Sequence, residues 1–166
     1  MKRTNFRGMK CSIAQTLDLI GEWWTPLILR DIFYGVRRFE GLLAHLGISR
    51  NILTDRLQTL VENEILERRP YQSNPERFEY MLTERGIDLY PILISLMAWG
   101  DRWLPGEEGP PVELIHKECG KPATPEIVCA HCRKAITARG VRANILSEEL
   151  SSELSALRAA SGPRKK

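Results

Sequence analysis

The sequence has no long run of apolar residues, and no segment approaches the roughly 18 that span a bilayer. Its basic first ten residues are not followed by the apolar region of a signal peptide. We therefore expect a cytoplasmic protein that has no membrane partner. With 166 residues, the chain has room for one domain of about 100 residues and an appendage, but not for two large domains.

Cysteine is also scarce, with four residues in the chain. Three of them lie within fourteen residues and close to a histidine. A reducing cytosol keeps such cysteines as thiols or metal ligands, so we do not expect a fold that depends on disulfides. The excess of basic over acidic residues is small, 24 against 21, for a net charge of +3. This charge is compatible with a nucleic-acid partner but does not require one.

Apolar residues recur at helical spacing in four successive segments of the first half of the chain. Ser12 is the expected N-cap of the first segment, Thr25 of the second and Ser49 of the fourth. A tight turn containing Gly47 joins the third and fourth segments, which is the arrangement of a helix-turn-helix. The predicted helices cover residues 12–21, 26–33, 39–46 and 50–62.

Two β-prone segments, 65–71 and 78–82, follow with a polar turn between them and predict a protruding hairpin. A long helix is then expected from Thr83 to Leu104, kinked at Pro91 because proline lacks the backbone N–H of a helix interior. The predicted fold class is therefore mainly α with a small β-hairpin wing, which is a winged helix-turn-helix.

A stretch rich in Gly, Pro and Glu follows the long helix and indicates a domain boundary. The segment after it differs in kind, since it carries the clustered cysteines and then an amphipathic pattern. We expect no internal repeat. The expected ranges are 1–104 for the winged helix-turn-helix, 105–111 for a linker, 112–140 for a Cys/His tail, and 141–166 for an amphipathic helix with a disordered basic end.

The segment 50–62 has two different sides. Leucines form the side that faces the core, whereas the opposite side carries polar residue types that can reach base edges in a major groove. Basic side chains elsewhere can neutralise phosphates without reading the sequence. The alternative is an ordinary solvated surface. The candidate DNA-binding residues are Ser49, Arg50, Asn51 and Thr54 for the reading segment, and Arg37, Arg38 and Arg77 for phosphates.

The tail contains two pairs of metal-ligand residue types, His116 with Cys119 and Cys129 with Cys132, separated by nine residues. Four nitrogen and sulfur ligands at this spacing suit tetrahedral zinc, and a site closed by four protein ligands is structural. The expected cofactor is therefore one structural zinc ion in a zinc-ribbon-like appendage. His131 competes with His116 as a ligand, and the alternatives to a metal are free thiols or a redox pair of Cys129 and Cys132.

Several blocks of residues occur together in an order that resembles the HxlR-type family of winged helix-turn-helix regulators, over about residues 8–104. They are Cys11 at the start of the first helix, Gly21-Glu-Trp-Trp24-Thr-Pro-Leu-Ile-Leu29, Gly35-Val-Arg-Arg-Phe39, Gly47-Ile-Ser49, Leu53-Thr-Asp-Arg-Leu57 and Phe78-Glu-Tyr-Met-Leu-Thr83. The resemblance implies a homodimer joined by the first and last helices, with 50–62 as the reading helix and 66–82 as the wing.

The chain departs from the family pattern at two places. Ser12 follows Cys11 where proline is expected, which leaves the fold unaffected. In the wing, Glu76 stands beside Arg77, and its carboxylate offsets part of the attraction of that arginine for phosphate.

Cys11 is a candidate redox sensor, because a helix start and cationic neighbours such as Arg7 and Lys10 favour a thiolate. The resemblance supports this role, since some members of the family respond to electrophiles through a cysteine in this region. The alternative for Cys11 is a small buried residue.

We therefore predict a sequence-specific transcription regulator that binds a pseudopalindromic operator in double-stranded DNA as a homodimer, and that responds to an oxidant or a small-molecule effector. We expect no enzymatic activity. The alternative function is a winged-helix protein-interaction module with a structural zinc tail.

Overall fold

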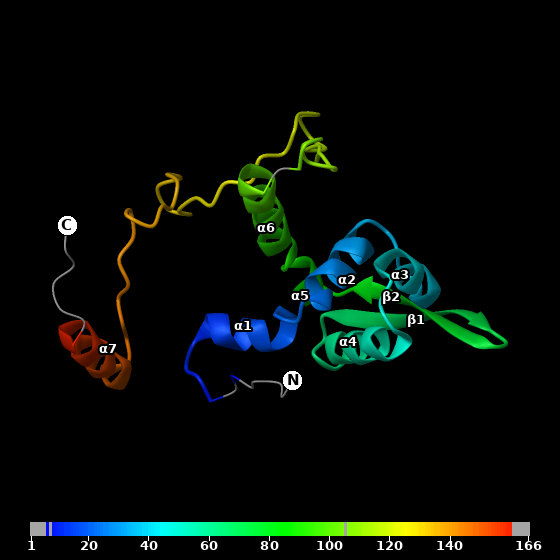
Figure 1. Ribbon diagram of the computed structural model, residues 1–166, viewed down its shortest axis with the longest axis horizontal. Helices are drawn as coiled ribbons and strands as arrows, with labels where there is room; N and C mark the ends of the chain where they lie inside the picture. The colour runs from blue at the N-terminus through cyan, green and yellow to red at the C-terminus, as the bar shows by residue number, and fades with distance from the viewer. Residues whose placement is uncertain (1–5, 7, 105, 161–166) are drawn as a thin grey trace. The chain divides into compact units, whose positions relative to one another are not determined.

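The computed structural model describes residues 6, 8–104 and 106–160, which form seven helices and one two-stranded hairpin (Figure 1). The chain divides into two units, Met1–Pro125 and Glu126–Lys166. The first unit extends beyond the expected linker at 105–111, and the expected domain ranges stay a prediction. The first unit contains α1 (Ser12–Ile20), α2 (Trp24–Phe33), α3 (Phe39–Leu46), α4 (Arg50–Glu62), β1 (Leu66–Ser73), β2 (Glu76–Leu82), α5 (Glu84–Ile87) and α6 (Tyr90–Trp103).

Helices α3 and α4 have the predicted bounds, and the turn between them has the expected chemistry. Gly47 adopts a φ of 64°, a left-handed conformation that glycine reaches without steric cost, and its N–H donates to the carbonyl oxygen of Leu43 at 3.1 Å. Ser49 then caps α4, because its hydroxyl oxygen accepts from the N–H of Ile52 at 3.3 Å. The predicted helix-turn-helix is confirmed.

The predicted caps of the first two helices are wrong. Cys11, not Ser12, occupies the N-cap position of α1, and its side chain makes no capping hydrogen bond. Helix α2 begins at Trp24, so Thr25 lies inside it, where its side chain is buried. The N–H of Thr25 donates to the carbonyl oxygen of Glu22 at 2.9 Å. A backbone carbonyl of the preceding turn thus satisfies an N–H at the start of α2, and no side chain is needed for it.

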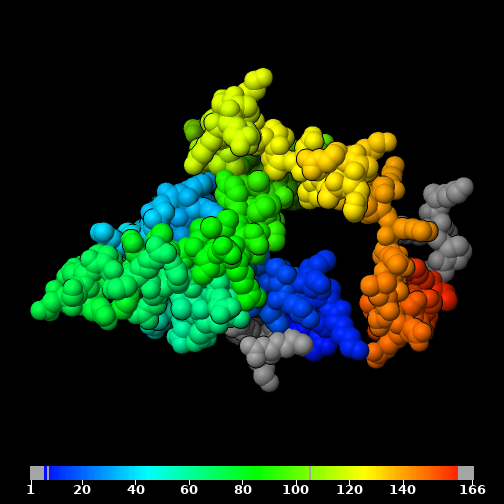
Figure 2. All heavy atoms as spheres, turned by 180° about the vertical axis from the view of Figure 1, so that it is seen from behind, coloured from blue at the N-terminus to red at the C-terminus, as the bar shows by residue number. Residues whose placement is uncertain are grey.

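The hairpin is antiparallel, and its register runs from Leu66 opposite Leu82 to Ser73 opposite Glu76. Its strands extend closer to the tip than predicted, because backbone pairing continues through polar residues that carry no apolar alternation. The pairing shifts at Tyr71, which is an extra residue in β1. Figure 1 shows the hairpin reaching beyond α3 and α4, and Figure 2 shows the same protrusion in space-filling form.

The prediction of one long helix from Thr83 to Leu104 is wrong, because this segment forms two helices, α5 and α6. Thr83 caps the short α5, accepting from the N–H of Gly86 at 3.1 Å. A Cβ at Gly86 would collide with the carbonyl oxygen of Ile65, so α5 lies against the start of the hairpin. Pro91 lies in the first turn of α6, where its missing N–H is not needed. The helical structure is interrupted before it, between α5 and α6.

The core lies among α2, α3, α4 and the base of the hairpin. One buried charge, the carboxylate of Asp31, is fully enclosed on α2 and requires partners because it has lost its water. Arg30 donates to it at 2.8 Å, and Nδ1 of His45 on α3 lies 2.6 Å from it, so the cluster links α2 to α3. The buried apolar residues are Ile20, Ile28, Leu29, Ile32, Leu42, Ile48, Leu53, Leu57, Leu60, Ile65 and Leu66.

The second unit contains α7 (Glu148–Ala160), which confirms a helix in the last amphipathic segment. Its start is stabilised by Ser147, whose hydroxyl oxygen accepts from the N–H of Leu150 at 3.3 Å. No residue of α7 is buried. The basic end at 164–166 lies outside the described residues. Along the described chain, every helix is too short or too polar to cross a membrane.

Candidate nucleic-acid interface

Arg50 begins α4 and is held by an acid on the preceding helix. Two nitrogens of its guanidinium donate to the two carboxylate oxygens of Glu40, at 2.9 and 2.8 Å, and its central carbon lies 5.5 Å from the ring centroid of Phe39. This hydrogen bonding lowers the pKa of Glu40 and raises the pKa of Arg50, so both are charged at neutral pH. The sequence pattern predicts that Arg50 is available for a base edge, but it does not indicate the pair with Glu40.

The other reading candidates on α4 are exposed. Asn51 and Thr54 lie on the side of the helix away from the buried Leu53 and Leu57. Their amide and hydroxyl groups therefore face solvent, where they can donate and accept hydrogen bonds. Ser49 takes the capping role, because its hydroxyl is used by the backbone of α4.

Arg56 is the basic residue of α4 that is turned toward the protein. Its side chain is only 15% exposed and pairs with Asp55 at 2.7 Å and with Glu22 at 3.7 Å. It thus anchors α4 to the segment before α2. Arg50 is consequently the basic residue of α4 that lies on the exposed side of the helix.

The segment before α3 is tied to the hairpin by backbone pairing. The N–H of Tyr80 donates to the carbonyl oxygen of Arg37 at 2.8 Å, and Arg38 forms an isolated bridge with Glu79. The guanidinium of Arg38 stacks on the ring of Tyr71, 4.1 Å from its centroid. The side chains of Arg37 and Arg38 are exposed, as a contact with phosphate requires.

The start of α3 and the hairpin enclose a groove that brings basic and acidic groups together. Arg77, on β2, is close enough to Glu40 to help lower the pKa of that carboxyl. Glu40 and Glu76 therefore both temper the positive charge that Arg38 and Arg77 give to this groove. The groove is lined by Arg38, Phe39, Glu40, Gly41, Tyr71, Glu76, Arg77, Phe78 and Tyr80.

Arg68 is a basic residue of the hairpin that the sequence analysis did not select. It is exposed on β1, and its guanidinium lies 4.0 Å from the ring centroid of Phe78. The alternation of polar and aromatic residues in the two strands could have indicated this stacking. In addition to Arg77, the wing therefore carries an exposed cation that is held against an aromatic ring.

Cys11 is exposed, which does not fit the alternative of a small buried residue. It precedes α1 with an extended backbone. Lys10 is also exposed, whereas the other expected cationic neighbour, Arg7, lies outside the described residues.

The expected metal ligands occur in two separate turns. Nδ1 of His116 and Sγ of Cys119 are 3.4 Å apart in the first turn. In the second turn, the backbone N–H groups of Cys132 and His131 and the thiol of Cys132 form hydrogen bonds to Cys129 and lower the pKa of its thiol. Among the described residues, no three His, Cys, Asp or Glu side chains converge on one point, so each turn contributes a pair.

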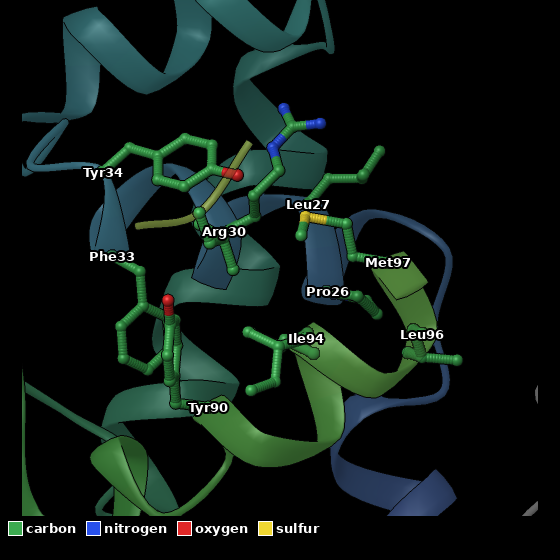
Figure 3. A pocket seen from close by; sticks show the side chains of 11 residues that line it. Pro26, Leu27, Arg30, Phe33, Tyr34, Tyr90, Ile94, Leu96 and Met97 are labelled. Carbon is green, nitrogen blue, oxygen red and sulfur yellow. The ribbon is translucent and has the colours of Figure 1, made fainter. Parts of the chain in front are cut away.

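A hollow of about 310 Å³ lies between α2 and α6 (Figure 3). The rings of Phe33 and Tyr90 meet at one end, with their centroids 4.7 Å apart, and Leu96 and Met97 line it from α6. Arg30 is the charged residue of an otherwise largely apolar lining. Such a lining suits an apolar ligand or apolar side chains of another chain.

Comparison with known proteins connects these features. A family model described as HxlR-like helix-turn-helix matches residues 19–108. The uncharacterised HTH-type transcriptional regulator Rv3095 of Mycobacterium tuberculosis is 52% identical over 130 residues, which is 78% of this chain and 82% of that protein.

Solved structures show the same fold. The crystal structure of PA1607, a proposed transcription factor, has a TM-score of 0.76 and 33% identity and covers 85% of this chain and 99% of that chain. The redox regulator HypR in its oxidised form has a TM-score of 0.52 and 32% identity, and covers 55% of this chain and 96% of that chain. With a capped helix after the glycine turn, a hairpin wing and a family match over more than half its length, this chain belongs to the HxlR-like helix-turn-helix family of transcriptional regulators.

Proposed function

We propose that this regulator recognises a pseudopalindromic operator in double-stranded DNA as a homodimer, with α4 as its reading helix. The observation that carries the proposal is the two-sided α4, which follows a glycine turn, is capped by Ser49, and exposes Asn51 and Thr54. A helix placed in this way after a tight turn enters the major groove with its first turns toward the bases.

Different residues are proposed to read the bases and to bind the phosphates. Asn51 can pair in a bidentate manner with an adenine, and Thr54 can bind a base edge or contact a thymine methyl group. Arg37, Arg38, Arg68 and the more distal Arg77 bind phosphates, which fixes the register of the protein on the duplex without reading the sequence.

Selection of bound sequences from a random DNA pool tests this division. The wild-type chain should enrich a pseudopalindrome whose half-sites are about 34–36 Å apart, which is one helical turn. Changing both Asn51 and Thr54 to alanine should abolish the enrichment, because each well-formed base contact contributes about 1–3 kcal/mol of discrimination.

The control for this experiment is Gln58→Ala, farther along the exposed side of α4, where Gln58 donates to Glu62. This variant should retain the wild-type consensus. No enrichment by a folded wild-type protein would favour the alternative function, a winged-helix protein-interaction module.

Glu40 restrains Arg50 in the free protein, and DNA must compete with it. A phosphate or a guanine edge offers the guanidinium two acceptors in the same fork geometry as the carboxylate. The carboxylate also repels phosphates near Arg77. Glu40 is thus proposed to limit the affinity for DNA of any sequence.

Replacing Glu40 with glutamine should raise the affinity for non-specific DNA several-fold at low salt, because one repulsive charge is removed while the side chain keeps its size. The measurement is fluorescence anisotropy of labelled duplexes across a salt series. Glu113→Gln, which makes the same charge change in the segment after α6, should alter affinity much less. Weaker binding by the Glu40 variant would instead mean that Glu40 presents Arg50 to DNA.

The homodimer is proposed from apolar side chains that a single chain leaves in solvent. Leu96, Trp99 and Trp103 recur on one side of α6 and are 58%, 58% and 60% exposed, and Ile13 and Leu17 of α1 are exposed as well. Several large apolar side chains exposed along one side of a helix are typical of interfaces between proteins. A two-fold axis would present α4 twice and match a pseudopalindromic site.

Leu96→Asp should convert the dimer into monomers in sedimentation velocity, since a carboxylate on the interface would lose its water, and should weaken operator binding in parallel. Leu146→Asp is the matched control, because Leu146 is 90% exposed and lies in the second unit. A wild-type monomer, or an unchanged dimer in the Leu96 variant, would contradict this interface.

Oxidant response is proposed for Cys11. Its thiol is exposed at the start of α1, a helix assigned to the dimer interface, and the similar HypR is described as a redox regulator. The sulfur of Cys11 attacks a hydroperoxide, so an S–O bond forms and the O–O bond breaks. The thiol proton passes to the leaving alkoxide, and a sulfenic acid and an alcohol result. A change at this position would alter the orientation of α1 in the dimer and weaken operator binding.

Cys11→Ser should bind the operator like the wild type but keep its affinity after treatment with cumene hydroperoxide, whereas the wild type should lose at least tenfold and recover with a thiol reductant. An unchanged oxidant response in Cys11→Ser would assign the response to the cysteines of the tail.

A further inference from the structure

The tail contains the same backbone turn twice, thirteen residues apart. In the first turn, the N–H of His116 donates to the carbonyl oxygen of Lys121 at 2.9 Å, and the N–H of Gly120 donates to that of His116 at 2.8 Å. In the second turn, the N–H of Cys129 donates to the carbonyl oxygen of Lys134 at 2.9 Å, and the N–H of Arg133 donates to that of Cys129 at 2.8 Å. The expectation of no internal repeat is therefore wrong.

The flanking residues repeat in the same way. Ile115 bridges Pro122 around the first turn, and Val128 bridges Ala135 around the second. Two more equivalent hydrogen bonds lie outside these bridges. The N–H of Ala123 donates to the carbonyl oxygen of Leu114 at 2.7 Å, and the N–H of Ile136 donates to the carbonyl oxygen of Ile127 at 2.8 Å. Each turn is thus a miniature hairpin.

Both turns pass through the left-handed region at the same position. Gly120 has a φ of 68°, and its equivalent Arg133 has a φ of 60°. Arginine gains nothing sterically from this conformation, so the local structure must hold it there. The residue that precedes each of these, Cys119 or Cys132, is a cysteine at the fourth position of its turn.

The repeat decides which histidine matches a ligand position. His116 is equivalent to Cys129, at the first position of its turn, whereas His131 is equivalent to Glu118. First and fourth positions therefore hold His116 and Cys119 in one turn, and Cys129 and Cys132 in the other. His131 falls at a position that carries a glutamate in the first turn, and not a nitrogen or sulfur ligand.

The two ligand atoms of the first pair lie at a separation that suits a metal ion. Sγ of Cys119 lies 3.4 Å from Nδ1 of His116, close to the roughly 3.5 Å expected for two atoms bound tetrahedrally to zinc at about 2.3 and 2.0 Å. In the second turn, the backbone N–H groups of His131 and Cys132 donate to the sulfur of Cys129. Such donors stabilise a metal-bound thiolate from outside the coordination sphere.

Apolar burial does not account for these well-formed turns. Ile115, Ile127 and Ile136 beside them are exposed, and no apolar residue from 112 to 160 belongs to the buried core. Small segments that lack a core fold when a metal contributes its binding free energy.

We propose that His116, Cys119, Cys129 and Cys132 form one structural zinc site, to which each turn contributes two ligands. Four protein ligands complete a tetrahedron and leave no position for a substrate water, so the ion stabilises the tail rather than catalysing a reaction. The site is independent of the proposed DNA function.

The test is the metal content of the full chain, purified under reducing conditions and measured by mass spectrometry of the metal. The wild type should carry one zinc ion per chain, and after exchange Co²⁺ should give the intense visible bands of a tetrahedral site. His116→Ala and Cys129→Ser, one from each turn, should each weaken zinc binding at least tenfold in competition with a chromogenic chelator.

Two variants are matched controls. His131→Ala and Cys11→Ser each remove the same residue type outside the proposed ligand set, and both should retain one zinc ion per chain. Retained operator binding by every variant would show that the first unit is folded. A zinc-free wild type without Co²⁺ bands, a reversible Cys129–Cys132 disulfide in its place, or loss of zinc in His131→Ala would overturn the proposal.

Discussion

The burial of three leucines on one side of α4 is the constraint on which the rest of the site depends. Leu53, Leu57 and Leu60 are almost fully buried, so the rotation of α4 about its axis is fixed by the core. This rotation in turn determines which side chains face solvent, and it turns Arg56 inward to Glu22 and leaves Asn51 outside. A rotation by one residue would expose a leucine and remove the reading side, so the same burial stabilises the fold and orients its functional surface.

Electrostatics on this surface are balanced rather than uniformly basic. Arg50 is paired with Glu40, and Arg77 lies beside Glu76, while aromatic rings order the guanidinium groups of Arg38 and Arg68. Ordered cations lose less side-chain entropy when they bind a phosphate, whereas neighbouring acids reduce the attraction for phosphate in general. In the proposed DNA-binding function, this balance favours binding that depends on contacts with particular bases over binding to any duplex.

Local signals explain what could be predicted from the sequence. The bounds of α3 and α4 follow from Gly47 and Ser49, which act on their own turn. Thr25 was misjudged as a cap because packing into the core outweighs the preference of threonine for a helix start.

Contacts between distant residues were not predictable in this way. Glu40 and Arg50 are ten residues apart across a turn, and no periodicity connects them. The repeat in the tail was missed for another reason. Few residues coincide at an offset of thirteen, namely Glu113 with Glu126, Cys119 with Cys132, Lys121 with Lys134 and Thr124 with Thr137, so it is the backbone that reveals the equivalence.

The bridge between Arg38 and Glu79 has a consequence for how such regulators diverge. It pairs the backbone of the wing with the segment just before α3, so the wing and the start of the helix-turn-helix form one unit, and a shift of the wing would break this pairing. Asn51 and Thr54 belong to no such unit, because they contribute nothing to the core. If α4 reads DNA as proposed, duplicated copies of the gene could acquire new targets through a few surface substitutions while the contacts with phosphates stayed unchanged, and specificity could change at little risk to folding.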